Sequence, residues 1–234
     1  DIIISAISPI PLSASKKFGI QSIAISNFTW LDIFSKMDNF NLNHIQESYE
    51  NASFCIQLPL STSMDVFKQK KQVGIVCKLP TDDNLSIRKK LNIDPSKFLI
   101  LINLPNFFNV TLKNFKNFQV ISTGAKTSSN NTIFIEPWIE GQNLINSSDL
   151  VISKCGYGMI SECLTNGTPF QLIADELHPE QNAMLKHLSD YGIHNTIPNW
   201  KNGQIEIDFN NIQYFESFKN DNSNAKNIVQ VFLN

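Results

Sequence analysis

The stretch Asp149–Phe170, DLVISKCGYGMISECLTNGTPF, decides the fold. Its apolar start at residues 150–152 predicts a buried strand, and Gly156 and Gly158 punctuate the turn that follows. We expect a helix to begin near Tyr157 and to end at Gly167. Backbone N–H groups converge at a helix N-terminus and the helix dipole adds partial positive charge, so this arrangement can hold an anion. Many α/β proteins place glycines in such turns for structural reasons alone, and both interpretations stay open.

Ser161 and Glu162 come next in this helix, and we expect both in its first turn. A hydroxyl there can donate to a phosphate oxygen, and a carboxylate can accept from two neighbouring ribose hydroxyls. The alternative for Glu162 is an acid that the helix dipole favours near the N-terminus. Because a carboxylate repels a phosphate, the two side chains would have to serve opposite ends of a nucleotide.

Outward from this stretch, apolar strand patterns alternate with helical patterns. The predicted strands are 2–4, 22–26, 53–58, 73–76, 98–103, 118–122, 132–135, 150–152 and 170–173. The predicted helices are 9–17, 31–49 with an interruption at 38–43, 85–91, 142–146, 157–166, 179–191, 209–218 and 225–232. Such alternation predicts parallel sheets with right-handed crossovers, and ligands lie beyond the carboxyl ends of such strands. Residues 78–84 have linker composition, so we expect two α/β units.

Composition limits the classes of function. A net charge of −2 over 234 residues leaves no basic footprint, so no nucleic-acid partner is predicted. The four cysteines show no CxxC spacing, which favours unpaired thiols in a reducing, cytoplasmic compartment. The longest apolar run, 98–104, is too short to span a bilayer, so we expect no integral membrane segment. Work at a membrane surface stays open, and the histidines show no metal-ligand spacing, so no metal site is predicted.

Three further segments agree with one resemblance. The run 152–162 with Gly167-x-Pro169 resembles the donor-nucleotide motif of GT-B glycosyltransferases, nearest to the branch with MurG-like enzymes and the glycosyltransferase-like part of arabinokinase-type proteins. Pro137-Trp138-Ile139 is similar to the family's base-packing segment. The segment 179–183, PEQNA, is similar to its sugar-contacting segment, and Asn27-Phe28-Thr29-Trp30 to a stretch of its N-terminal half.

This resemblance implies an α/β fold of two Rossmann-like parallel-sheet domains (GT-B), the first incomplete. Residues 1–79 would be the remnant of an acceptor-side domain, and residues 80–234 the donor domain. The implied nucleotide-binding residues are Trp138, Ile139, Gly156, Gly158, Ser161 and Glu162, with Gly158 and Ser161 at the diphosphate and Glu162 at the ribose. The donor-sugar candidates are His178, Glu180 and Gln181, and the acceptor-side candidates are Asn27, Trp30 and Asp32. A plain loop histidine is the alternative for His178, and a helix-start aspartate is the alternative for Asp32.

The implied activity is transfer of a hexosyl group from a UDP-sugar to an unidentified acceptor, with inversion and without a metal. The UDP-sugar would be the substrate, and no cofactor is expected. The sequence departs from the family at 103–106, where Pro105 removes a backbone donor from a turn that is usually glycine-rich. The family's N-terminal glycine loop and catalytic base have no counterpart, so we expect the base outside this chain and assign no catalytic residue. A UDP-sugar-binding module without transfer activity is the main alternative, and a GT-B-shaped epimerase is a third.

Overall fold

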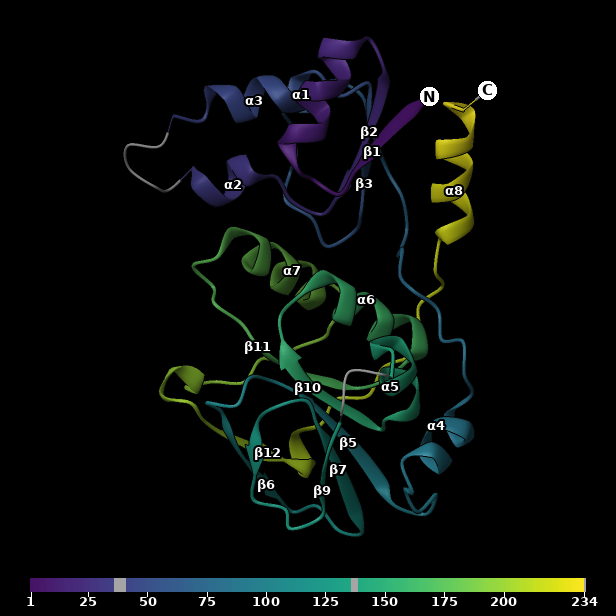
Figure 1. The fold of residues 1–234 in the computed structure, drawn as a ribbon. Helices are drawn as coiled ribbons and strands as arrows, with labels where there is room; N and C mark the ends of the chain where they lie inside the picture. The colour runs from purple at the N-terminus through teal and green to yellow at the C-terminus, as the bar shows by residue number, and fades with distance from the viewer. Residues whose placement is uncertain (36–40, 136–138, 234) are drawn as a thin grey trace. The chain divides into compact units, whose positions relative to one another are not determined.

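The computed structural model describes residues 1–35, 41–135 and 139–233. Contacts divide the chain into two compact units (Figure 1). The first unit comprises Asp1–Val76, Asp175–Asp190 and the residues from Lys219 onward, and the second comprises Cys77–Ala174 and Tyr191–Phe218. The first change of unit, after Val76, lies near the predicted boundary after residue 79, but two later segments return to the first unit. The functional labels given to the two predicted domains stay predictions.

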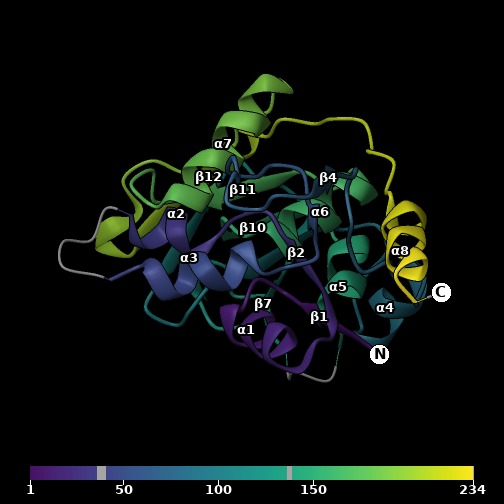
Figure 2. The ribbon, with the colours of Figure 1, turned by 90° about the horizontal axis from the view of Figure 1, so that it is seen from above.

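The first unit is built on a four-stranded parallel sheet in the order β1-β2-β3-β4. Its strands are β1 (Ile2–Ser5), β2 (Gln21–Ser26), β3 (Phe54–Gln57) and β4 (Lys70–Gln72). Its helices are α1 (Pro9–Phe18), α2 (Trp30–Phe34), α3 (Asn43–Glu50), α7 (Pro179–Asp190) and α8 (Asn222–Val231). Helices α1 and α3 lie side by side (Figure 1 and Figure 2), where the Ser13 and Ser48 hydroxyls are 2.6 Å apart.

The second unit contains a five-stranded parallel sheet in the order β11-β10-β5-β7-β9. These strands are β5 (Phe98–Asn103), β7 (Phe118–Ser122), β9 (Thr132–Phe134), β10 (Leu150–Lys154) and β11 (Phe170–Ile173). A smaller parallel sheet has the order β12-β6-β8, from β6 (Asn109–Lys113), β8 (Lys126–Thr127) and β12 (Gln204–Asp208). The helices are α4 (Asn84–Lys90), α5 (Gly141–Ser147) and α6 (Tyr157–Asn166), with 3-10 turns η1 (Trp200–Asn202) and η2 (Phe209–Asn211).

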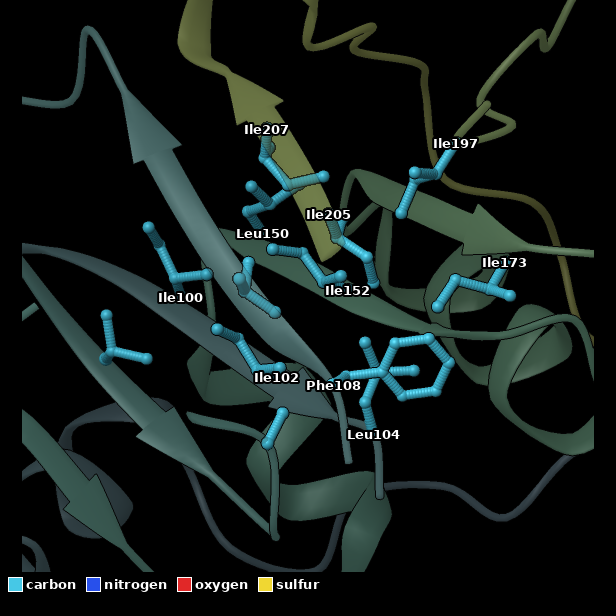
Figure 3. Close-up of a cluster of buried hydrophobic side chains, with 13 residues drawn as sticks. Ile100, Ile102, Leu104, Phe108, Leu150, Ile152, Ile173, Ile197, Ile205 and Ile207 are labelled. Atoms are coloured by element: carbon cyan, nitrogen blue, oxygen red, sulfur yellow. The ribbon is translucent and has the colours of Figure 1, made fainter. Parts of the chain in front are cut away.

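The two faces of the five-stranded sheet have different partners. Ile100 and Ile152, from one face, join a buried cluster with Ile205 and Ile207 of β12 (Figure 3). Each such side chain stabilises the fold by about 1.5–3 kcal/mol when it leaves water. Because successive strand residues point to opposite faces, Leu101 and Val151 lie on the other face, toward α5 and α6. The continuous apolar runs that predicted these strands reflect burial on both faces.

Most predicted elements are present, with two errors and one omission. The predicted strand at 73–76 is wrong, because the fourth strand is the exposed, polar Lys70–Gln72 at the edge of its sheet, where no apolar pattern is required. The predicted helix at 209–218 is wrong, because only the short turn η2 forms there. The small sheet was not predicted, although QIEID at Gln204–Asp208 alternates as a half-buried strand should, with Ile205 and Ile207 buried.

Candidate functional site

In the five-stranded sheet of the second unit, the side on which the chain adds strands reverses at β5. The chain adds β7 and β9 on one side of β5 and then returns through α5 to place β10 and β11 on the other side. The connections after β5 and β10 therefore diverge at the carboxyl ends of these two neighbouring strands. Open α/β sheets bind their ligands at such switch points.

A cavity of about 330 Å³ lies at this switch point. Its lining residues all belong to the second unit and are Leu101, Asn103, Thr123, Ile139, Gly141, Leu144, Ile145, Val151, Gly158, Met159 and Glu162. The lining is mostly apolar with a few polar side chains, which is typical of a small-molecule site, and the size falls within the usual range of roughly 300–1,000 Å³. A larger hollow of about 500 Å³ beside β12 contains none of the predicted site residues.

The glycines at the start of α6 leave free space. Gly156 is the N-cap in an extended conformation (φ −152°, ψ 139°), and Gly158 is the second helical residue. A Cβ atom added at either position would meet no heavy atom within 4 Å. By contrast, a Cβ at Gly124 would lie 2.9 Å from the carbonyl oxygen of Leu104. Neither backbone conformation nor packing against the described residues requires glycine at 156 or 158, which favours access for a ligand over a structural role.

Ser161 and Glu162 do not lie in the first turn of α6, so that expectation is wrong. The helix begins at Tyr157, which makes them its fifth and sixth residues. Ser161 is 1% exposed, and its hydroxyl donates to the carbonyl oxygen of Gly158 at 2.8 Å. Its hydrogen is therefore used inside the helix, and contact with a phosphate stays a prediction.

Among the described lining residues, Glu162 is the ionisable group of the cavity wall. It is partly buried, and this burial raises its pKa to about 7, against a lowering effect of the nearby Lys78. The Lys78 Nζ atom itself bonds to Glu140 at 2.7 Å, and no donor among the described residues bonds to the Glu162 carboxylate. The helix dipole fades beyond the first turn, so it does not account for this acid. A partly dry carboxylate without a partner in a cleft is a candidate for ligand binding.

The structure brings three of the predicted nucleotide-binding residues to this cavity: Ile139, Gly158 and Glu162. Gly156 lies directly before α6, two residues from Gly158. Ile139 is 9% exposed, so its side chain forms part of the wall. Trp138 lies outside the described residues, and its contact with a base stays a prediction.

The predicted sugar-side residues lie at the start of α7 in the first unit. The side-chain oxygen of Gln181 accepts from the backbone N–H of Asp175 at 2.8 Å, which orders the turn before the helix. Glu180 Oε1 accepts from Asn27 Nδ2 at 3.3 Å, so a sugar-side candidate meets an acceptor-side candidate. The Nδ1 atom of His178 is buried without a hydrogen-bond partner among the described residues, which leaves it available to a ligand or water.

The other acceptor-side candidates have clear structural contacts. Asp32 Oδ2 accepts from the backbone N–H and hydroxyl of Thr29, at 2.8 and 2.7 Å, and from the Thr62 hydroxyl at 2.8 Å. With Thr29 it forms the capping box of α2, which is the helix-start role offered as its alternative. The Trp30 ring stacks on Phe34, with centroids 5.4 Å apart. Contact of either residue with an acceptor stays a prediction.

Sequence reasoning missed two polar cavity residues, Asn103 and Thr123. The Thr123 hydroxyl donates to Asn103 Oδ1 at 3.0 Å, which orients the amide. Their position directly at or after two correctly predicted strand ends was the signal that could have identified them. Among residues 1–35, 41–135 and 139–233, no group of three or more His, Cys, Asp or Glu side chains could hold a metal ion. In the same ranges, no helix has the length and apolar character needed to cross a membrane.

Comparison with known proteins gives one sequence relative and several similar structures. No protein-family model matches the chain. The L-arabinokinase of Arabidopsis thaliana is 24% identical over 205 residues, which cover 82% of this chain and 20% of that protein. A UDP-glucosyltransferase from Polygonum tinctorium superposes with a TM-score of 0.56 at 10% identity, over 87% of this chain and 63% of that one. UGT89C1 of Arabidopsis thaliana, in complex with UDP-L-rhamnose, superposes with a TM-score of 0.53 at 10% identity, over 94% of this chain and 60% of that one.

The spinosyn forosaminyltransferase SpnP also matches, with a TM-score of 0.54 at 10% identity, over 86% of this chain and 63% of that one. These structures have two Rossmann-like domains, and the chain has the same α/β GT-B fold. The chain spans a fifth of the length of the arabinokinase and about three fifths of the length of these structures.

Proposed function

We propose that this chain binds a UDP-sugar and acts as the donor-binding part of a glycosyltransferase, which moves a hexosyl group to an acceptor. The observation that carries the proposal is the cavity at the β5–β10 switch point, where the Glu162 carboxylate has no hydrogen-bond donor among the described residues and open space lies over Gly158. The structural likeness to a UDP-glucosyltransferase and to an enzyme in complex with UDP-L-rhamnose supports the same class of ligand. The sequence likeness to L-arabinokinase fits a chain that is part of a larger protein.

Each part of the nucleotide has a candidate partner. Glu162 would accept hydrogen bonds from both ribose hydroxyls, and the N-terminus of α6 at Gly156 and Gly158 would receive the diphosphate. Ile139, with Trp138, would lie against the uracil base. His178, Glu180 and Gln181 would contact the donor sugar.

The proposed reaction is an inverting displacement without a metal. An acceptor hydroxyl oxygen attacks the anomeric carbon while the bond from that carbon to the diphosphate oxygen breaks, so UDP leaves with the bonding electron pair. The N–H groups at the start of α6 would stabilise the charge on the leaving diphosphate. The acceptor proton passes to a base for which no residue of this chain is assigned.

Calorimetric titration with UDP tests the binding site. Glu162→Ala should weaken UDP binding at least tenfold, because hydrogen bonds to a charged group contribute about 1.5–3 kcal/mol each. Glu206→Gln is the control, since Glu206 pairs with Lys113 on β12 outside the cavity, and it should leave the affinity unchanged. Absence of UDP binding to the wild type, or equal affinity of Glu162→Ala, would contradict the proposal.

The pH dependence of binding gives an independent check. With a pKa of about 7, Glu162 is mostly protonated at pH 6, so an interaction that needs the carboxylate should weaken roughly tenfold from pH 8 to pH 6. Uridine is the ligand to use, because it has no phosphate that titrates in the same range. The dependence of uridine affinity on pH should disappear in Glu162→Gln. A wild-type affinity that does not depend on pH would argue against a ribose contact by the carboxylate.

Turnover separates a transferase from a module that only binds. Release of UDP from a UDP-sugar in the presence of an acceptor mixture indicates transfer, whereas formation of an epimeric sugar nucleotide indicates the epimerase alternative. Binding of UDP-sugars without either product favours the non-catalytic module. Repeating the transferase assay with EDTA tests metal independence, and the anomeric configuration of the product tests inversion.

A further inference from the structure

The chain enters the second unit beside the two helices that line the cavity. Cys77, the first residue of this unit, donates from Sγ to the hydroxyl of Thr165 on α6 at 3.3 Å. Lys78, the next residue, pairs through Nζ with Glu140, the N-cap of α5, at 2.7 Å. Helices α5 and α6 pack against each other. Two consecutive residues therefore connect the start of α5 with the second half of α6.

This connection lies beside Glu162. Thr165 follows Glu162 by three residues, which places the two side chains on the same side of α6. Burial raises the pKa of the Cys77 thiol, and the nearby Glu162 carboxylate raises it further. Burial also raises the pKa of Glu162, and Lys78 acts on it in the opposite direction. Cys77 and Lys78 are thus both close enough to interact with this carboxylate electrostatically.

Contacts with α5 hold Lys78 in place. Its Nζ atom bonds to Glu140, and the chain just beyond it is tied to the first turn of the same helix. The side-chain oxygen of Asn143, which is 4% exposed, accepts from the backbone N–H groups of Thr81 and Asp82, at 2.9 and 3.2 Å. A buried amide with these partners fixes the backbone that carries Lys78.

The other ionisable groups around Glu162 supply no positive charge. Burial raises the pKa values of the Cys77 and Cys163 thiols, so both are neutral near pH 7. Glu140 is a carboxylate, and its partner is Lys78. The described lining residues from the five-stranded sheet, Leu101, Asn103 and Val151, do not ionise. Within the described part of the chain, Lys78 is therefore the cation that offsets the burial of the Glu162 charge.

We propose that Lys78 is a positioning residue of the nucleotide site, whose ammonium group, held by Glu140, favours the ionised Glu162 carboxylate that accepts the ribose hydroxyls. This inference rests on the proposed function and adds a residue to its site. Lys78 would act through Glu162 and would not touch the ribose. Because its Nζ atom bonds to Glu140, the oxygens of Glu162 stay available to the ligand.

The experiment measures uridine affinity of the full chain between pH 6 and pH 8.5, at low ionic strength to limit screening. At pH 7 about half of the wild-type Glu162 is ionised, so Lys78→Met should weaken binding about threefold. At pH 8.5 Glu162 is mostly ionised in both proteins, so their affinities should agree within roughly 1.5-fold. A purely structural role of Lys78 would weaken binding equally at both pH values.

Three variants serve as controls. Lys78→Arg keeps the positive charge and should keep the wild-type pH profile. In the Glu162→Gln background, Lys78→Met should change uridine affinity less than roughly 1.5-fold at pH 7, because the group through which it acts is gone. Lys113→Met removes the same charge from the second unit, but Lys113 pairs with Glu206 outside the cavity, so it should leave the profile unchanged.

Distinct results overturn the inference and the proposed function. Lys78 does not act through Glu162 if Lys78→Met binds as the wild type does at pH 7, or loses the same factor at pH 8.5 or in the Glu162→Gln background. Lys78→Gln repeats the comparison if Lys78→Met lowers the melting temperature. If wild-type affinity does not depend on pH, the ribose contact of Glu162 fails. If the wild type binds neither uridine nor UDP, the proposed function itself fails.

Discussion

At the scale of single residues, the Glu162 carboxylate is partly shielded from water and also lines the cavity at the switch point. Its pKa of about 7 follows from burial, because the partly dry cavity wall disfavours the charged form. A carboxyl group in an unfolded chain titrates near 4.5, so between pH 4.5 and 7 the folded state binds more protons than the unfolded state. The free energy of unfolding must therefore fall as the pH rises through this range.

Glu162→Gln should remove this loss of stability. Near pH 4.5 the wild type and the variant should have similar free energies of unfolding, because the carboxyl is neutral in the folded state. At pH 8 the variant should be more stable by about 1–3 kcal/mol, a range that allows for solvent screening of a partly exposed group. Urea unfolding at both pH values measures the difference, and a variant that is less stable than the wild type at pH 8 would argue against a destabilising charge.

At the scale of the secondary-structure element, a substitution at the start of α6 is expected to change helix stability and ligand binding in opposite directions. Glycine costs a helix up to about 1 kcal/mol relative to alanine, and a Cβ at Gly158 would meet only open space. The proposed ligand would occupy this space. The N–H groups of the same turn supply the expected anion site.

Gly158→Ala should thus raise stability by about 0.5–1 kcal/mol and weaken UDP binding at least tenfold. Asn166→Ala, at the other end of α6, should raise stability modestly and leave UDP affinity unchanged. Thermal unfolding and calorimetric titration of both variants give the two quantities. Wild-type UDP affinity in Gly158→Ala would show that the ligand does not approach this residue.

At the scale of the whole molecule, the two units are not two consecutive halves of the chain. The first unit takes α7 and α8 from the C-terminal part, where Met184 and Leu188 are 0% and 2% exposed. Phe232, just after α8, packs on Phe54 of β3 with ring centroids 5.3 Å apart, and Asp221 accepts from the backbone N–H of Gly74 at 2.8 Å. A cut after residue 79 would remove all of these contacts from the first sheet.

The fragment 1–79 should therefore not unfold cooperatively on its own. A second-unit protein, residues 77–218 with 175–190 replaced by a Gly/Ser linker, keeps its contacts and should fold and bind UDP. Circular dichroism melts and UDP titration of both proteins check this expectation. A cooperative melt of fragment 1–79 near that of the full chain would show that α7 and α8 are dispensable for the first unit.

The sequence by itself determined several of the buried strands and the glycine turn of this protein. Strands 98–103, 118–122 and 170–173 have the predicted bounds, because burial on both faces leaves uninterrupted apolar runs between polar turns. The edge strand Lys70–Gln72 is exposed along its length, so it leaves no such pattern. Only the tertiary structure decided that the Ser161 hydroxyl bonds within its own helix, that Glu162 lies partly dry at the β5–β10 switch point, and that α7 belongs with the first sheet. The positions of Glu162 and α7 depend on contacts between residues far apart in the chain, and the Ser161 bond depends on where α6 begins. Local periodicity reports how much a residue is buried but not which groups it meets.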